Sequence, residues 1–385
     1  MNAPTPAPVA GTTATASDRP APLLLNPGPV TLSERVRRAL LQPDLCHRES
    51  EFFDLQDEAR ARLLRVYDLP ATQWAPVLLT GSGTAAVEAM ISSLIPADGR
   101  LLVIENGVYG ERISAIATRH GIASEALHGE WGADIDLAAL TARLDATPAI
   151  THVAVVHHET TTGRLNPLDK IGGLCRQRGI GILLDAVSSF GAEAIDFENG
   201  GIVAAAAGAN KCLHGVPGAC FVLARHEALA AGHPRTMYLD LAAWERAQAQ
   251  RGTPFTPSVH AYYALLEALR EFEDEGGLAA RHARYAALAE HVRAGLATLG
   301  IAALLPAEQS SVVLRSYRLP EGIDYPTLHD GLKAAGFVIY AGQGVLSQTM
   351  FRISTMGALS DADMQRLIDA VASIVSTAAA PAPAR

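Results

Sequence analysis

The middle of the chain alternates short apolar runs with helical stretches, and this rhythm limits its fold more than any other feature. The runs are too short for helices, whereas the stretches between them have the three- to four-residue apolar spacing of helices. The expected strands are APVLLTGSGT, RLLVIENG, IASEAL, THVAVVHHE, IGILLDAVS, IVAAAAGA and GACFVLAR. Because helices that join parallel strands cover both faces of a sheet, the pattern predicts an α/β fold with a mostly parallel sheet.

The pattern changes after about Ser258, where two long amphipathic helices are expected. SSVVLRSY, FVIYAG and FRIST then read as strands of a smaller α+β unit, and a final helix follows. Ser360 is predicted to cap that helix together with Asp363, three residues later. The expected divisions are a disordered lead over 1–21, a large α/β domain over 22–275, a small C-terminal α+β domain over 276–378 and a disordered tail over 379–385.

Composition narrows the class of protein. Hydrophobic residues make up 49% of the 385, which is enough for a large core. The net charge of −9 with scattered Lys and Arg argues against nucleic acid as a partner. The sequence has no apolar run of about 18 residues and no signal-peptide pattern, so we expect no membrane span and a cytoplasmic location. Four cysteines without a C-x-x-C pair are typical of buried, reduced thiols, and no metal is expected.

Ligands of open α/β sheets bind beyond the carboxyl ends of the strands, where TGSGTAAVEA is found. Gly81 and Gly83 allow tight turns, Ser82 and Thr84 offer hydroxyls, and the following helix presents its N-terminal amides. This arrangement suits an anion, most often a phosphate. The alternative is an ordinary glycine turn that starts a helix, since neither a Walker loop nor G-x-G-x-x-G is present.

Three further side chains lie at expected strand ends. Tyr109 follows RLLVIENG and can stack on a flat ring, or can pack as ordinary core. Asp185 ends ILLD, where a carboxylate needs a cation, a hydrogen bond or a helix to cap. Lys211 follows IVAAAAGA in a neutral stretch, where desolvation favours its nucleophilic amine. The alternative is a lysine that extends from the strand end into water.

Together these groups match the needs of pyridoxal 5'-phosphate. The glycine turn would take the phosphate, the tyrosine would cover one face of the ring, and the carboxylate would keep the pyridine nitrogen protonated. The lysine would hold the aldehyde and then move protons. We therefore interpret Lys211 and Asp185 as the catalytic pair.

Several motifs resemble those of the class V aminotransferases of fold type I. The matching stretches are LLLNPGPVT, HRESEF, GSGTAAVEA, NGVYGER, HHETTTGRLNPLD, LLDAVSSFG, ANKCLHGVPG, FTPS and FRISTMG. They run from about Leu23 to the final helix. The resemblance implies a large mostly parallel mixed-sheet domain with a smaller C-terminal domain, and a homodimer with shared active sites.

The resemblance also implies roles for individual residues. Lys211 forms the Schiff base, Asp185 pairs with the pyridine nitrogen, Val187 packs beneath the ring, Tyr109 stacks above it and Thr160 reaches the ring hydroxyl.

Further residues are implied for the anionic groups. Ser82, Gly83 and Thr84 bind the phosphate, and Asn210 lies close to it. Thr256 reaches the phosphate of the cofactor in the partner subunit. Arg352 clamps the acidic group of the substrate, which its planar fork suits.

Within the family, the motifs are most similar to those of enzymes that act on 2-aminoethylphosphonate and pyruvate. This likeness implies a ping-pong transamination through Lys211 that yields phosphonoacetaldehyde and L-alanine, with a small amine donor and a keto acid acceptor as partners. Two departures bear on the substrate: Gln343 stands where a lysine is expected, and STMG follows Arg352 in place of a GCIG-like segment.

Other functions remain open at this point. Within the fold, the alternatives are an alanine– or serine–glyoxylate aminotransferase, or a pyridoxal phosphate lyase acting on a related aminophosphonate. Cysteine desulfuration is a weaker alternative. From other classes, the alternatives are a non-catalytic binding module and a nucleotide-dependent dehydrogenase, although the latter lacks G-x-G-x-x-G.

Overall fold

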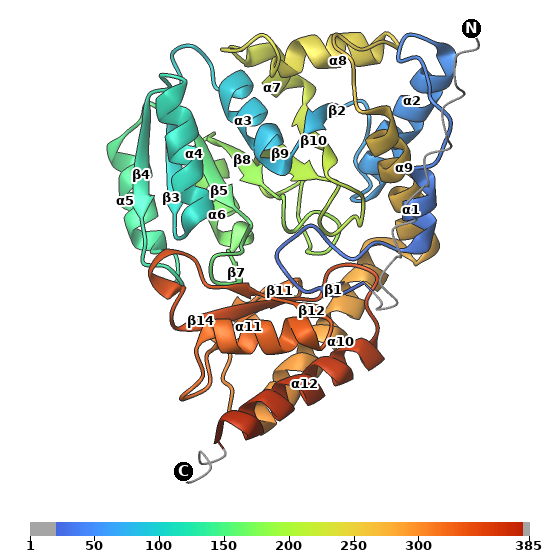
Figure 1. Ribbon diagram of the computed structural model, residues 1–385. Coiled ribbons are helices and arrows are strands. Elements are labelled where there is room, and N and C mark those ends of the chain that lie inside the picture. Colours follow the sequence, from blue (N-terminus) through green and yellow to red (C-terminus); the bar gives the residue numbers. More distant parts are fainter. Residues whose placement is uncertain (1–20, 380–385) are drawn as a thin grey trace, which may run out of the picture.

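A seven-stranded mixed sheet forms the centre of the protein, whose computed structural model describes residues 21–379 (Figure 1). The strand order is β2-β10-β9-β8-β5-β3-β4. The strands are β2 (Trp74–Gly81), β3 (Arg100–Glu105), β4 (Ser124–His128), β5 (Ile150–Val156), β8 (Gly181–Asp185), β9 (Ile202–Gly208) and β10 (Gly218–Arg225). Only β10 within this sheet runs antiparallel to its neighbours, so the predicted mostly parallel α/β sheet is confirmed.

Helices cover both faces of this sheet (Figure 1). One face packs against α3 (Gly83–Leu94), α4 (Val108–Arg119), α7 (His226–Ala231) and α8 (Leu241–Ala249). The other packs against α1 (Glu34–Ala39), α2 (Ser50–Arg65), α5 (Leu137–Ala146), α6 (Leu168–Arg176) and α9 (Val259–Asp274). Successive side chains of a strand point to opposite faces of the sheet. In β2, Val77 and Leu79 pack on the face covered by α3, whereas Leu78 packs on the face covered by α2.

A smaller α+β unit follows and lies below the large sheet in Figure 1. Its sheet has the order β11-β14-β13, and helices pack against it. The elements are α10 (Gly277–Thr298), β11 (Leu314–Arg318), α11 (Tyr325–Ala334), β13 (Tyr340–Ala341), β14 (Met350–Ser354) and α12 (Asp361–Ala379). Short additional elements are β6 (His158–Glu159), β7 (Arg164–Leu165), η1 (Ala307–Gln309) and η2 (Gly344–Leu346).

The stretch FVIYAG differs from its prediction as a single strand. It divides at Ile339 into β12 (Phe337–Val338) and β13, which belong to different sheets. β12 pairs in parallel with β1 (Leu23–Leu24), an element that the sequence did not indicate, while β13 pairs antiparallel with β14. The N-terminal segment thus contacts the small unit, and the bounds of the two domains stay a prediction.

Two local expectations had different outcomes. At the start of α12, the Asp363 amide donates to Ser360 Oγ at 3.2 Å and the Ser360 amide donates to Asp363 Oδ2 at 2.9 Å, so the predicted cap is confirmed. The prediction of four buried cysteines was wrong for Cys46, which is exposed in the turn between α1 and α2; the other three are buried.

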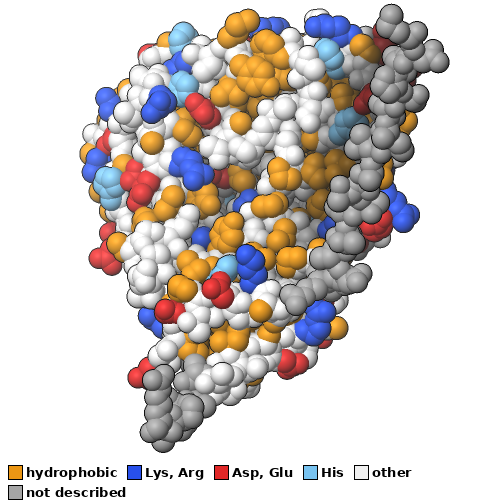
Figure 2. Space-filling view, viewed as in Figure 1, with side chains coloured by type: hydrophobic (Ala, Val, Ile, Leu, Met, Phe, Trp, Pro, Cys, Tyr) orange, Lys and Arg blue, Asp and Glu red, His pale blue; other side chains and the backbone are white. Residues whose placement is uncertain are grey.

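The surface and the ends of the chain complete the description. Figure 2 shows Lys and Arg side chains interspersed with Asp and Glu on the face it presents. Among residues 21–379, none of the helices is both long and apolar enough to cross a membrane. Apart from residues 21 and 379, the predicted lead and tail lie outside the described residues, and Ala379 is the last residue of α12.

Candidate active site

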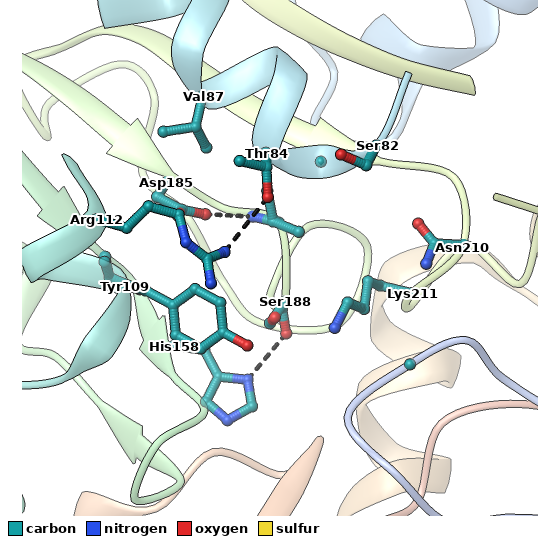
Figure 3. A pocket seen from close by; sticks show the side chains of 14 residues that line it. Ser82, Thr84, Val87, Tyr109, Arg112, His158, Asp185, Ser188, Asn210 and Lys211 are labelled. Carbon is teal, nitrogen blue, oxygen red and sulfur yellow. Dashed lines mark hydrogen bonds between the residues drawn. The ribbon is translucent and has the colours of Figure 1, made fainter. Parts of the chain in front are cut away.

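The carboxyl ends of β2, β3, β8 and β9 meet around one cavity of about 170 Å³ (Figure 3). They meet because these four strands run in the same direction. Eight of the predicted site residues line the cavity: Ser82, Gly83, Thr84, Tyr109, Asp185, Val187, Asn210 and Lys211. The structure therefore brings together side chains that are up to 129 positions apart in the sequence (82 to 211).

The first wall of the cavity is the start of α3. Ser82 occupies the N-cap position, yet its side chain makes no capping hydrogen bond, so its hydroxyl remains available. The first amides of a helix have no partner inside the helix and carry its positive dipole end. A Cβ at Gly83 would lie 2.5 Å from Val187 Cγ1, so only glycine fits here. This wall can hold an anion through a hydroxyl and backbone amides.

Asp185 ends β8 and is 7% exposed. Its Oδ1 accepts the Val187 amide at 3.0 Å. Burial raises the pKa of this carboxyl to about 6, although the Val187 amide and the charges of Lys211 and Arg112 act in the opposite direction. A cationic partner inside the cavity would relieve the cost of the buried negative charge.

Lys211 lies just beyond β9 and is half-buried, whereas Lys170 and Lys333, the other two lysines of the sequence, are exposed. Its Nζ donates to the Pro27 carbonyl. A Cβ at Gly28 would lie 2.9 Å from Nζ, so the N-terminal segment passes directly against this amine.

The electrostatic surroundings of Lys211 favour a neutral amine. Burial lowers the pKa of the ammonium to about 8; Cys212 and Asp185 raise it, while Arg352 and Arg112 lower it further. A neutral amine is the form that attacks an aldehyde or accepts a proton. A pKa of about 8 makes the neutral form of Lys211 far more accessible near neutral pH than that of an ordinary lysine, which suits it to both tasks.

Tyr109 stands at the start of α4, and its ring faces the same space as Lys211 and Asp185 (Figure 3). Its amide donates to Glu159 Oε2 at 3.3 Å, and Glu159 Oε1 accepts the Thr161 amide at 2.9 Å. The buried Glu159 carboxylate thus connects the tyrosine to the turn that carries Thr160. Burial is also the main cause that raises the pKa of Glu159.

Thr160 and Arg352 contact each other but do not line the cavity. The Arg352 Nη1 group donates to the Thr160 carbonyl at 2.8 Å. Thr160 Oγ1 is buried and has no hydrogen-bond partner among residues 21–379, which is unusual for a hydroxyl. Arg352 is 3% exposed, and burial lowers the pKa of its guanidinium.

Thr256 is the predicted site residue that lies apart from the others. It is exposed, outside the cavity, with its hydroxyl 3.5 Å from His47 Nε2. A role at the cavity of its own chain does not follow from this position. Its expected contact with the cofactor of a partner subunit stays a prediction.

Sequence reasoning missed Arg112, which lines the cavity. Its guanidinium lies 4.7 Å from the centre of the Tyr109 ring, and its Nη1 donates to Thr84 Oγ1 at 3.3 Å. Arg112 follows Tyr109 by three positions on α4, which places both on one face of the helix. That spacing, applied to NGVYGER, was the available signal.

His158 is the second missed residue. Its Nδ1 donates to the Ser188 carbonyl at 2.9 Å, so Nε2 carries the lone pair, and Nε2 has no partner within the described part of the chain. Burial lowers the pKa of His158 to about 4, which keeps the ring neutral. The histidine pair in HHETTTG was visible in the sequence, but nothing there showed which of the two lines the cavity.

Similarity to known sequences is extensive. Residues 38–367 match the family model of the class V aminotransferases. A protein from Aeromonas hydrophila named 2-aminoethylphosphonate–pyruvate transaminase is 41% identical over 91% of this chain and 94% of its own length. A protein of the same name from Syntrophobacter fumaroxidans is 40% identical over 90% and 95% of the two chains.

Solved structures give the same picture of the fold. Pyridoxamine–pyruvate aminotransferase from Mesorhizobium loti superposes with a TM-score of 0.86 at 29% identity, covering 94% of each chain. Alanine–glyoxylate aminotransferase from Nostoc sp. superposes with a TM-score of 0.86 at 27% identity, covering 93% of this chain and 96% of its own. The predicted fold-type I architecture is confirmed. Together with the family match, these likenesses place the chain in the class V aminotransferase family.

Proposed function

We propose that this aminotransferase uses pyridoxal 5'-phosphate to move the amino group of 2-aminoethylphosphonate to pyruvate, giving phosphonoacetaldehyde and L-alanine. One observation carries the proposal: the half-buried lysine amine and a buried carboxylate line the same cavity as a helix N-terminus suited to phosphate. The curated relatives at about 40% identity carry the name of this reaction, which supports the choice of substrates.

The residues present fit the cofactor. Ser82 Oγ and the first amides of α3 suit its phosphate, and Tyr109 offers an aromatic face. Thr160 Oγ1, buried without a partner in the described chain, suits a ring hydroxyl. Asp185 lacks a cationic hydrogen-bond partner in the described part of the chain, and a protonated ring nitrogen would supply one. When bound, the cofactor supplies an electron sink for the carbon that carries the amine.

Three residues of the chain have roles in the proposed reaction. The Lys211 amine, whose pKa burial lowers to about 8, would remove a proton from the amine-bearing carbon of the substrate and deliver it to the bound cofactor. Asp185 would keep a proton on the ring nitrogen of the bound cofactor. Arg352 offers the Nη2 edge of its guanidinium to the phosphonate in one half-reaction and to the pyruvate carboxylate in the other. Alternating use of one cation fits a ping-pong sequence.

Assembly belongs to the same proposal. We infer a homodimer in which Thr256 of each chain contacts the cofactor phosphate of the other, because Thr256 is exposed and lies away from its own cavity.

Paired half-reactions test the function. The enzyme loaded with pyridoxal phosphate is mixed separately with 2-aminoethylphosphonate, alanine and serine, and the aminated enzyme is then mixed with pyruvate or glyoxylate. We expect the fastest loss of the lysine-bound cofactor band with 2-aminoethylphosphonate, and its return with pyruvate. Faster reaction with alanine and glyoxylate would favour the activity named for the Nostoc neighbour. Release of ammonia from 2-aminoethylphosphonate without any keto acid would indicate a lyase.

A further inference from the structure

Gln343 lies between Arg352 and the turn that carries Thr161. Its Oε1 accepts from Arg352 Nη1 at 3.3 Å and from Thr161 Oγ1 at 3.4 Å. The Thr161 oxygen already accepts the Val108 amide at 3.1 Å, so its proton is available for Gln343. An amide nitrogen in the same place would oppose the donor of Arg352, which has no acceptor, so the oxygen faces Arg352 and can also accept the Thr161 hydroxyl.

These contacts fix one edge of the Arg352 guanidinium. Its Nε donates to the Ala341 carbonyl at 2.9 Å, and its Nη1 donates to the Thr160 carbonyl at 2.8 Å and to Gln343. Its Nη2 makes no hydrogen bond among residues 21–379. This nitrogen is also not fully enclosed by the protein. Because the group is planar, fixing the Nε–Nη1 edge also fixes the direction of Nη2.

The charge of the acceptor matters as much as its position. Within the described chain, Arg352 has no carboxylate within 4.0 Å, and all three of its acceptors are uncharged oxygens. A neutral acceptor orients the cation and leaves its attraction for an external anion intact. A carboxylate would also orient the cation, but its negative charge would cancel much of that attraction.

We propose that Gln343 is a positioning residue, which holds the Arg352 fork so that Nη2 meets the acidic group of both substrates. This inference rests on the proposed role of Arg352 as the substrate clamp. Gln343 also joins that clamp to Thr161, and through Val108 to the start of the helix that carries Tyr109. These contacts thereby fix the position of Arg352 relative to Tyr109.

The test compares Gln343→Ala, Gln343→Glu and the matched control Gln348→Ala, an exposed glutamine of the same loop, in enzyme loaded with pyridoxal phosphate. For Gln343→Ala we expect KM to rise about fivefold for both pyruvate and 2-aminoethylphosphonate, because Arg352 keeps its charge but loses part of its orientation. kcat and the Kd for pyridoxal phosphate should not change, because the reacting groups are untouched. Gln348→Ala should match the parent enzyme.

Gln343→Glu distinguishes the orientation of Arg352 from the net charge around it. Its carboxylate can accept the same hydrogen bonds but pairs with Arg352, so we expect KM to rise by at least about tenfold. A binding measurement that needs no turnover accompanies the kinetics: calorimetric titration with methylphosphonate should show the same order of weakening. A Gln343→Ala enzyme that binds methylphosphonate like the parent, while Arg352→Ala does not, overturns this inference alone. Unchanged binding in Arg352→Ala overturns the substrate clamp as well.

Discussion

Lys211 and Asp185 are both shifted by burial toward their neutral forms, with pKa values of about 8 and about 6. These shifts cost folding energy, because each group in its charged form would be better solvated in water. They also suit the chemistry, since a neutral amine is the nucleophile and a buried carboxylate attracts a protonated ring nitrogen. At the scale of residues, these two groups suit the proposed cofactor, which has an aldehyde and a basic ring.

Asp185→Asn tests this preparation, because Asn keeps the acceptor for the Val187 amide but removes the charge. In the folded protein the pKa of Asp185, about 6, exceeds its ordinary value of 3.8, so the folded state binds the proton more tightly. The penalty is therefore complete above pH 6 and fades as pH falls toward 3.8. In the cofactor-free enzyme at pH 7.5, we expect the variant to be more stable by up to about 3 kcal/mol.

Chemical unfolding of the parent and the variant at pH 7.5 and pH 4 measures this difference, and the gain should shrink at the lower pH. The same variant should lose at least about 100-fold in kcat. A variant that is destabilised at pH 7.5 and fully active would show that Asp185 serves only the fold.

Prediction from sequence worked best for residues that sit at strand ends. Ser82, Tyr109, Asp185 and Lys211 each follow an apolar run, and strand direction alone brings them to one cavity. The positions of Arg112 and His158 depend on which face of a helix or turn points inward, which apolar spacing did not settle for these polar residues.

Among the elements, the segment between β1 and α1 has the least regular structure and the closest approach to the amine. The Pro27 carbonyl accepts a hydrogen bond from Lys211 Nζ, and Gly28 adopts a φ of +116° directly against the lysine side chain. A conformation with positive φ suits glycine, and the missing Cβ leaves room for Nζ.

Gly28→Ala should therefore displace the Lys211 side chain. Gly322→Ala is the matched control, because Gly322 also has a positive φ of +77° but open space around its missing Cβ. Both variants should lose about 1 kcal/mol of stability from backbone strain, and only Gly28→Ala should lose the lysine-bound cofactor band. Absorbance spectra and unfolding curves measure the two effects. Equal spectra in both variants would contradict the close packing against Lys211.

The helices and strands of the large sheet were predicted well, because the spacing of apolar residues within each short segment indicates its secondary structure. The division of FVIYAG into β12 and β13 was not, since it depends on β1 pairing from more than 300 positions away. Two-residue strands carry too little pattern to be found in isolation.

At the scale of the whole molecule, the cavity is lined by residues 28–211, whereas the proposed substrate clamp, Arg352, comes from the small unit. The contact of Arg352 with Thr160 joins the small unit to the large sheet, and the pairing of β1 with β12 returns the N-terminal segment to the small unit. The relative placement of these units therefore sets the distance from the proposed clamp, Arg352, to the Lys211 amine. No local sequence pattern encodes that distance, which explains why the resemblance, rather than the spacing, suggested Arg352.

Thr256→Ala tests the proposed shared site of the dimer. Loss of one hydroxyl contact to the cofactor phosphate should raise the Kd for pyridoxal phosphate by about tenfold. Thr349→Ala, an exposed threonine of the small unit, serves as the control. Fluorescence titration measures Kd, and light scattering reports the assembly state. Unchanged affinity in a dimeric Thr256→Ala protein would contradict the shared site.

The most direct test of the account is to find which amine binds the cofactor. Borohydride reduction of the enzyme loaded with pyridoxal phosphate fixes the Schiff base, and peptide mass spectrometry then locates the label. The sequence offers three lysines, of which Lys170 and Lys333 are exposed. We predict one label per chain, on Lys211. A label on Lys170, on Lys333 or on the N-terminal amine, with Lys211 unmodified, would contradict the central claim.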